Sequence, residues 1–193
     1  MTMIDVEFYE RSIFTAYDMP AYLIVKSDVD FMLKAYEDSI IYIDDTLTGT
    51  IRRAGTQLIR LWDYNAHGDP STGRGIYTVT VELYDSGGRL LLTKKLKYLY
   101  DRYAYLVSFV DETGSNLGVD MTIMLARSLD VFFIQRFADK VELPPLSAGD
   151  KLVIEAYRVK NGNKYMYVAV NPTLAQSTTI KLTPNSANAV TVV

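Results

Sequence analysis

The dipeptide Asn161-Gly162 constrains this chain more than any other local feature, because it joins two runs rich in β-branched and aromatic residues, KLVIEAYRVK and NKYMYVAV. A type I′ turn needs positive φ at both central residues, and Asn-Gly adopts that conformation at little steric cost. Residues 151–170 are therefore predicted to form an antiparallel hairpin. The same pattern, period-two alternation ended by turn residues, guides the interpretation of the remaining sequence.

Alternation of this kind recurs along most of the chain. It predicts strands over residues 3–9, 39–44, 57–64, 76–85, 90–100, 103–110, 177–182 and 189–193, and residues 22–26 form a short apolar run. The connections between 76 and 110 are too short for a crossover helix, so these strands are predicted to form an antiparallel meander. Three segments have no single period: 27–36 fits a capped helical turn or a strand, and 117–127 and 131–137 fit either a strand or a helix.

About ten to twelve short strands, with turn signals roughly every 8 to 12 residues, are typical of an all-β sandwich. The chain has 193 residues and no evident linker or internal repeat. We therefore expect one antiparallel β-sandwich domain over residues 1–193, of jelly-roll or Greek-key topology, with at most one or two short helices.

Composition argues against several kinds of partner. The formal net charge is −3, from 20 basic and 23 acidic side chains without a basic cluster, so no nucleic-acid partner is expected. The chain has no cysteine, which excludes disulfides, thiolate metal sites and a cysteine nucleophile, and favours a reducing or very hot origin. The start MTMIDVEFYERS does not resemble a signal peptide, and no apolar run is long enough for a membrane span. The expected location is a virion or, alternatively, the cytoplasm.

Catalytic residue types are scarce. A Ser-His-Asp triad would have to use His67, the one histidine, and the chain has no Gly-x-Ser-x-Gly elbow. Glycoside hydrolysis needs two acids across a cleft, but nothing singles out a pair among Glu82, Asp111, Glu112 and Glu155. We predict that the chain is not an enzyme and binds no cofactor.

One loop offers a weak calcium candidate. Asp63, Asn65 and Asp69 follow the spacing of the first positions of an EF-hand loop. The match fails at the fifth position, His67, and at the twelfth, Arg74, which stands where a bidentate glutamate is required. An ordinary Asx-rich turn is the alternative, since these residues commonly serve turns.

Tyrosine is the most distinctive residue, with 15 tyrosines against one tryptophan. Core-edge packing in strands accounts for many such rings, but exposed rings also suit sugar stacking and the centres of protein interfaces. Together with an uncharged strand over 189–193, which needs a pairing partner, they define the expected interface. Its candidate residues are Tyr98, Tyr100, Tyr157, Tyr165, Tyr167, Val190 and Val192.

The hairpin has two different faces. Tyr165 and Tyr167 share one face, while Met166, Val168 and Val170 share the other. If the second face is the core, the two tyrosines point outward and need a partner.

The strand–turn runs YTVTVELYDSGGRLLLTKKLKY and LSAGDKLVIEAYRVKNGNKYMYVAV resemble the β-sandwich, jelly-roll-like virion structural proteins of viruses that infect hyperthermophilic archaea. The resemblance extends over the whole chain but lies only in the general pattern of strands and turns. It includes no specific motif, so no functional residue is carried over. It implies a homo-oligomeric capsid or virion-surface protein whose partners are copies of itself or other structural proteins. The alternatives are a carbohydrate-binding or adhesin-like module that binds glycan through its tyrosines and, third, a β-sandwich glycoside hydrolase.

Overall fold

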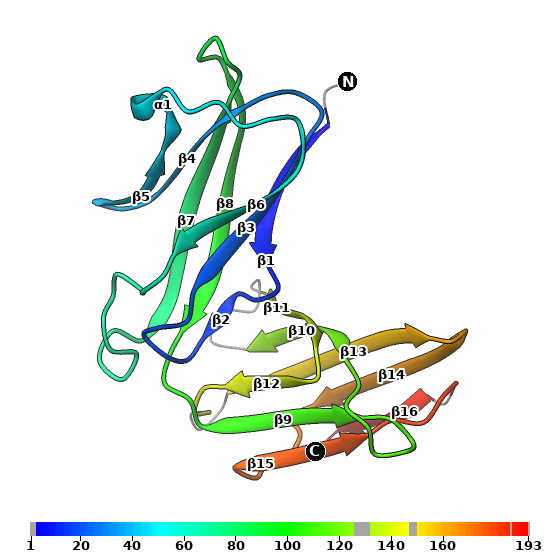
Figure 1. Cartoon of the computed structure of the whole chain (residues 1–193). Helices are drawn as coiled ribbons and strands as arrows, with labels where there is room; N and C mark the ends of the chain where they lie inside the picture. The colour runs from blue at the N-terminus through cyan, green and yellow to red at the C-terminus, as the bar shows by residue number, and fades with distance from the viewer. Residues whose placement is uncertain (1–2, 126–131, 147–149, 186, 193) are drawn as a thin grey trace. The chain divides into compact units, whose positions relative to one another are not determined.

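The computed structural model describes residues 3–125, 132–146, 150–185 and 187–192, most of which lie in strands (Figure 1). The one helix among these residues is a single turn, α1 (Asp45–Thr48). The predicted all-β class is therefore confirmed. Residues 126–127, 131 and 193, at the ends of three segments considered above, lie outside the described ranges.

The chain divides into two compact units. Unit 1 comprises Met1–Tyr9 and Tyr17–Tyr100, and unit 2 comprises Glu10–Ala16 and Asp101–Val193. The chain thus passes from one unit to the other three times. The prediction of a single sandwich over residues 1–193 did not include this division. None of the three crossings has the Gly- or Pro-rich composition of a linker, so no boundary between units could be recognised from the sequence.

Unit 1 contains two antiparallel sheets. The smaller sheet has the order β1-β3-β6, and four strands of the unit form the larger one in the order β8-β7-β4-β5. The strands are β1 (Ile4–Tyr9), β3 (Ala21–Ser27), β4 (Met32–Glu37), β5 (Ile40–Asp44), β6 (Gly55–Trp62), β7 (Gly75–Tyr84) and β8 (Leu90–Tyr100).

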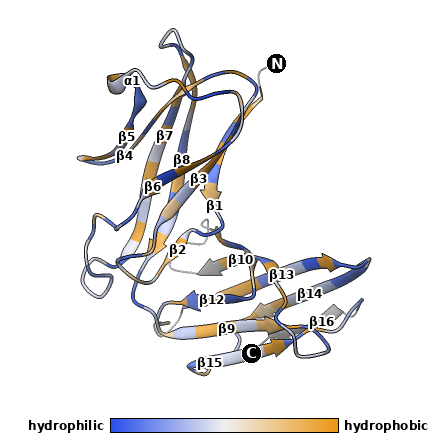
Figure 2. Cartoon of the chain, viewed as in Figure 1, coloured by the Kyte–Doolittle hydropathy of each residue, from blue (hydrophilic) through white to orange (hydrophobic). Residues whose placement is uncertain are grey.

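The core of unit 1 follows from alternation along these strands, which is visible as alternating colours on β7 (Figure 2). Val79, Val81 and Leu83 on β7 are completely buried. Rings from the two sheets meet across the core: Phe8 contacts the Tyr98 ring edge-on at 5.9 Å between centroids. The two sheets of unit 1 therefore pack face to face as a sandwich.

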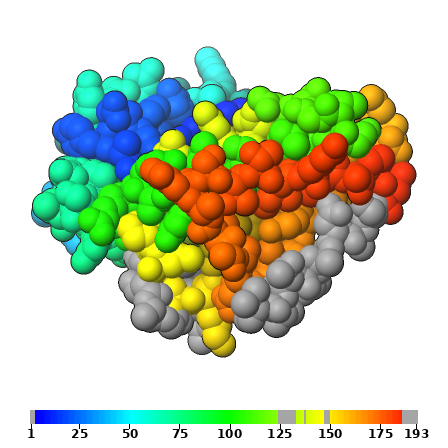
Figure 3. Space-filling model, turned by 90° about the horizontal axis from the view of Figure 1, so that it is seen from below, coloured from blue at the N-terminus to red at the C-terminus, as the bar shows by residue number. Residues whose placement is uncertain are grey.

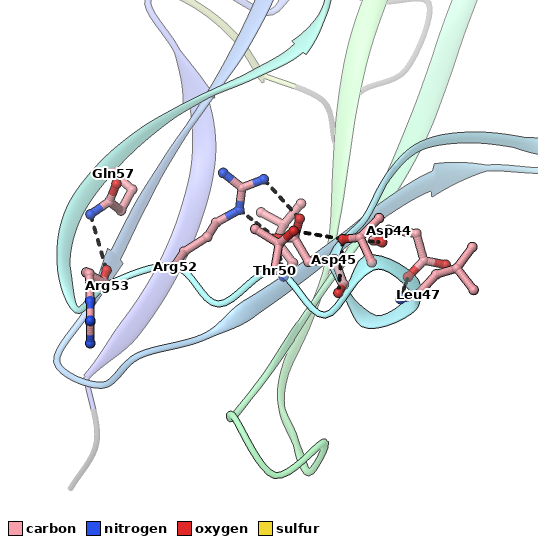
Figure 4. Close-up of polar contacts among 9 residues, drawn as sticks. Asp44, Asp45, Leu47, Thr50, Arg52, Arg53 and Gln57 are labelled. Carbon is pink, nitrogen blue, oxygen red and sulfur yellow. Dashed lines mark hydrogen bonds and ion pairs between the residues drawn. The ribbon is translucent and has the colours of Figure 1, made fainter.

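A buried ion pair holds the connection after β5. The Asp44 side chain caps α1 by accepting from the Leu47 amide at 3.1 Å. The next carboxylate, Asp45, is buried and accepts from Arg52 Nε at 2.6 Å and a second guanidinium nitrogen at 3.1 Å (Figure 4). It also accepts from the Leu33 amide at 3.0 Å, which attaches this connection to β4.

Unit 2 also contains two sheets, ordered β11-β10-β13-β14-β16 and β12-β9-β15. Most pairs are antiparallel, but β14 pairs with β16, and β9 with β15, in parallel. The strands are β9 (Tyr105–Val110), β10 (Val119–Leu125), β11 (Phe132–Ala138), β12 (Lys140–Leu143), β13 (Leu152–Lys160), β14 (Asn163–Val170), β15 (Ser177–Lys181) and β16 (Ala187–Val192). The short strand β2 (Ile13–Phe14) also belongs to this unit.

The predicted hairpin is β13–β14. Asn161 has φ of 52° and Gly162 has φ of 78°, as a type I′ turn requires. Near the turn, Lys160 Nζ lies 3.1 Å from Asp111 Oδ2, at the end of β9. The tip of the hairpin is thus fastened to the opposite sheet of unit 2.

Tyr165 and Tyr167 of this hairpin do not point outward. Their face is turned toward the core of unit 2, and the face of Met166 is turned away from it. Tyr165 is buried and donates to Glu112 Oε2 at 3.0 Å. Tyr167 is half-buried and contacts the Phe109 ring edge-on at 5.7 Å. Met166, by contrast, is exposed. The tyrosine face is the core because its rings fill the space between the sheets while a hydroxyl still reaches a carboxylate.

Two local expectations are decided by the structure. Residues 27–36, which fitted helix or strand, contribute to the strand β4. The predicted meander over 76–110 ends at β8, since β9 belongs to unit 2 and pairs with β12 and β15.

Candidate functional site

A polar buried group in unit 1 is centred on Glu37, at the end of β4. This carboxylate is almost completely buried and accepts from the hydroxyls of Tyr98 at 2.8 Å and Tyr42 at 3.1 Å. His67 Nε2 lies 3.3 Å from its other oxygen. Glu37 therefore keeps three polar partners while out of contact with water, as a buried carboxylate must.

His67 lies in the connection between β6 and β7, and its ring stacks on Tyr77 with 3.7 Å between centroids. Its amide donates to Asn65 Oδ1 at 2.9 Å, which closes an Asx turn. Tyr77 and Tyr100 donate their hydroxyls to the carbonyls of Gly73 and Gly68 in the same connection. These contacts hold residues 63–74 against β7 and β8.

Burial changes the acidity of the tyrosines in this group. Desolvation, followed by the neighbouring Tyr42 and the Glu37 carboxylate, raises the pKa of Tyr98, and desolvation raises that of Tyr42. Desolvation also raises the pKa of Tyr100 to about 12. All three hydroxyls therefore remain protonated donors at neutral pH.

The buried group around Glu37 gives His67, the one histidine in the sequence, a structural role. Among the described residues, the contacts of the His67 ring are with Glu37 and with aromatic rings, none of which is a serine or threonine nucleophile. Two of the carboxylates considered for glycoside hydrolysis have other contacts. Glu82 accepts from Tyr84 at 2.6 Å in unit 1, and Asp111 is paired with Lys160 in unit 2.

The calcium candidate is arranged as a set of turns. Asp63 lies 3.0 Å from the Arg60 guanidinium, Asn65 accepts from the His67 amide, and Asp69 accepts from the Ser71 amide at 2.7 Å. In the part of the chain that the structure describes, no group of three or more His, Asp or Glu side chains is placed to hold a metal ion.

Exposed apolar side chains gather on the outer face of the β13–β14 hairpin. Tyr157 is 43% exposed, Val159 48% and Met166 43%. Tyr157 and Met166 are directly opposite across the two strands, and Val159 is the next outward residue along β13. We call these three residues the outer-face patch. Tyr157 was predicted as an interface residue, and its side chain is exposed; Met166, on the face that the sequence allowed as the core, is exposed as well.

The strand β16 lies beside this patch and forms one edge of the five-stranded sheet. Ala187 is in register with Met166, and Val192 with Val170. The C-terminal stretch, orange-red to red, runs across the surface of unit 2 in Figure 3. Val190 and Val192 thus belong to a strand that pairs within its own unit on one side.

The remaining predicted interface residues are less accessible. Tyr98 and Tyr100 are completely buried in unit 1, and Tyr165 is buried in unit 2. Tyr167 is half-buried. Of the five predicted tyrosines, only Tyr157 is exposed.

Sequence reasoning missed an exposed aromatic pair in unit 1. The rings of Tyr17 and Tyr64 stack with 5.4 Å between centroids and 23° between planes, and they are 47% and 61% exposed. The Asn65 amide donates to the Tyr17 carbonyl at 3.0 Å, which brings together two segments far apart in sequence. No local sequence pattern predicts such a pair.

Comparison with known proteins finds no matching family model and no matching curated protein. Among solved structures, BcpA, the major pilin subunit of Bacillus cereus, is similar at 10% identity and a TM-score of 0.27, over 96% of this chain and 70% of that one. The Bacillus anthracis TIE protein is similar at 10% identity and a TM-score of 0.28, over 97% and 41%. The BSP domain of a biofilm-associated protein has 14% identity and a TM-score of 0.27, over 96% and 30%. Similarity at this level says nothing about function.

No helix in the described part of the chain is long and apolar enough to cross a membrane.

Proposed function

We propose that this chain is a non-enzymatic structural subunit of a larger assembly and that it works through protein–protein contacts. Within that class, the pattern of strands and turns along the sequence supports the role of a virion capsid or virion-surface component of a thermophilic system. The strands, turns and tyrosine content on which that resemblance depends are properties of the sequence.

The observation that carries the proposal is the outer-face patch beside an uncharged edge strand. Tyr157, Val159 and Met166 expose apolar surface on one sheet face, and β16 (ANAVTV) at its edge contains no charged residue. Exposed apolar patches and unprotected edges are liabilities for a monomer, and a subunit of an assembly covers both.

Light scattering after size-exclusion chromatography tests the proposal. The unmodified chain is expected to elute above monomer mass. The double variant Tyr157→Thr with Val159→Thr keeps strand-forming residues but removes apolar surface, so it shifts the equilibrium toward monomer. Leu58→Thr is the matched control, because Leu58 is an exposed strand residue of unit 1 outside the patch. Equal effects of both changes would refute a role for the patch.

A second candidate is a carbohydrate-binding module, which the exposed Tyr17–Tyr64 stack favours. Aromatic rings of this kind bind the apolar faces of sugars, and the exposed carboxylate of Asp63 lies next to Tyr64 in sequence. A glycan array probed with the chain and with Tyr64→Ala distinguishes this function. Signal lost in the variant supports it, and a blank array for the unmodified chain excludes it.

A further inference from the structure

We propose that unit 2 binds unit 2 of a second copy of this chain through β16, edge to edge and antiparallel, across a two-fold axis. This proposal rests on the structural function proposed above; it identifies the partner as a second copy of the chain and the contact as β16.

The first argument is the charge of the edge strands. In the two sheets β11-β10-β13-β14-β16 and β12-β9-β15, the other edge strands each carry at least one charged residue, such as Arg136 in β11, Lys140 in β12 and Lys181 in β15. Proteins commonly protect edges in this way, because a charge opposes addition of another strand. Among the described edge strands of these two sheets, β16 is the one without this protection.

The second argument is that the opposite edge of the same sheet is already covered. The Ser12 amide donates to the Ile134 carbonyl at 3.0 Å, and the Arg136 amide donates to the Glu10 carbonyl at 2.6 Å. Residues 10–12 thus occupy the outer side of β11. Head-to-tail addition of β16 to β11 of the next copy, which would build an open filament, would first have to break these bonds.

Self-pairing of β16 agrees with both observations. Two copies of β16 place no charge opposite another, whereas β16 against β11, β12 or β15 would bring a charged residue into the contact. A two-fold axis perpendicular to the sheet makes the contact self-complementary and closed. It also leaves both copies of the outer-face patch on the same side of one continuous sheet.

Cysteine scanning tests this geometry, because the natural chain contains no cysteine. Six variants would each carry one cysteine within β16, from Ala187→Cys to Val192→Cys. In a two-fold antiparallel pair, only the residue on the axis lies opposite its own copy, with Cα atoms about 5 Å apart, which a disulfide can bridge. One position further along, a residue and its copy are about 8 Å apart, which is too far.

The expected result is a sharp maximum of disulfide-linked dimer at one position of the six under mild oxidation. Thr179→Cys is the matched control, an exposed residue of the edge strand β15, and is expected to stay monomeric on a non-reducing gel. A second variant, Asn188→Lys, places a charge on β16 and should weaken self-association at least tenfold while circular dichroism stays unchanged.

The outcomes separate the two proposals. A chain that assembles by light scattering but shows no disulfide maximum, or equal crosslinking at all six positions, overturns the β16 pairing and leaves the structural function standing. A chain that remains monomeric at about 100 μM, where even weak specific contacts are populated, overturns both.

Discussion

Replacing Tyr98 by phenylalanine tests the buried group around Glu37. Tyr98 is completely buried, and its hydroxyl donates to Glu37 Oε2 at 2.8 Å. Hydrogen bonds to a charged group contribute about 1.5–3 kcal/mol, so Tyr98→Phe should lower the free energy of unfolding of unit 1 by about 2 kcal/mol at pH 7. The chain offers a matched control in Tyr100→Phe, since Tyr100 is equally buried but donates to a neutral carbonyl, that of Gly68. That change should cost about 1 kcal/mol.

Urea unfolding followed by tryptophan fluorescence is the assay. Trp62 is the one tryptophan, and its ring lies 5.1 Å from that of Tyr98, so its emission reports on unit 1. If Tyr98→Phe lowers the free energy of unfolding by no more than Tyr100→Phe does, the hydrogen bond from Tyr98 to Glu37 is not one to a charged carboxylate, and the reasoning is refuted.

Alkaline pH supplies a second readout of the same group. Burial raises the pKa of Tyr98, and that of Tyr100 to about 12, above the value of about 10 in an unfolded chain. The folded state therefore holds its protons more tightly, so this stability is complete below pH 10 and is lost as the pH rises further. The loss is about 1.4 kcal/mol per pH unit for each such tyrosine. Phenylalanine has no proton to lose, so the fall between pH 10 and 12 should be shallower by that amount in Tyr98→Phe.

Three further changes test other parts of the fold. Asp45→Ala should destabilise unit 1 by about 3 kcal/mol in the Trp62 assay, because it leaves the Arg52 guanidinium without its buried partner; a loss below that of an exposed pair, such as Arg60 with Asp63, would contradict this. Gly162→Ala should cost about 1–2 kcal/mol in urea unfolding followed by circular dichroism, because its φ is 78°, whereas Gly87→Ala, at a turn glycine without positive φ, should cost less. Dialysis against a chelator should leave the melting temperature unchanged, and a fall would restore the calcium candidate.

The elements with one apolar face could be predicted from sequence because alternation specifies them locally. β7 and the β13–β14 hairpin are of this kind, and the positive φ of Asn161 and Gly162 follows from turn chemistry alone. The core face of β14 could not be chosen in the same way, since Tyr165 and Tyr167 on one side compete with Met166, Val168 and Val170 on the other. Which face is covered depends on the opposite sheet, here on Phe109.

The candidate sites were harder to predict because they join distant segments. Glu37 and His67 are 30 residues apart, and Tyr98 is 61 residues from Glu37, so their contact follows from sheet register rather than from any motif. The two-unit division was missed for the same reason. Residues 10–12 form hydrogen bonds with β11, more than a hundred positions later in the chain. The uncharged edge strand, by contrast, was visible in the sequence as 189–193.

Sedimentation velocity of the unmodified chain over about 1 to 100 μM tests the central claim most directly, because specific contacts of micromolar affinity are populated across that range. If the chain is a structural subunit, the weight-average sedimentation coefficient rises with concentration from the monomer toward a dimer or a larger closed species. A coefficient that stays at the monomer value throughout would contradict the account.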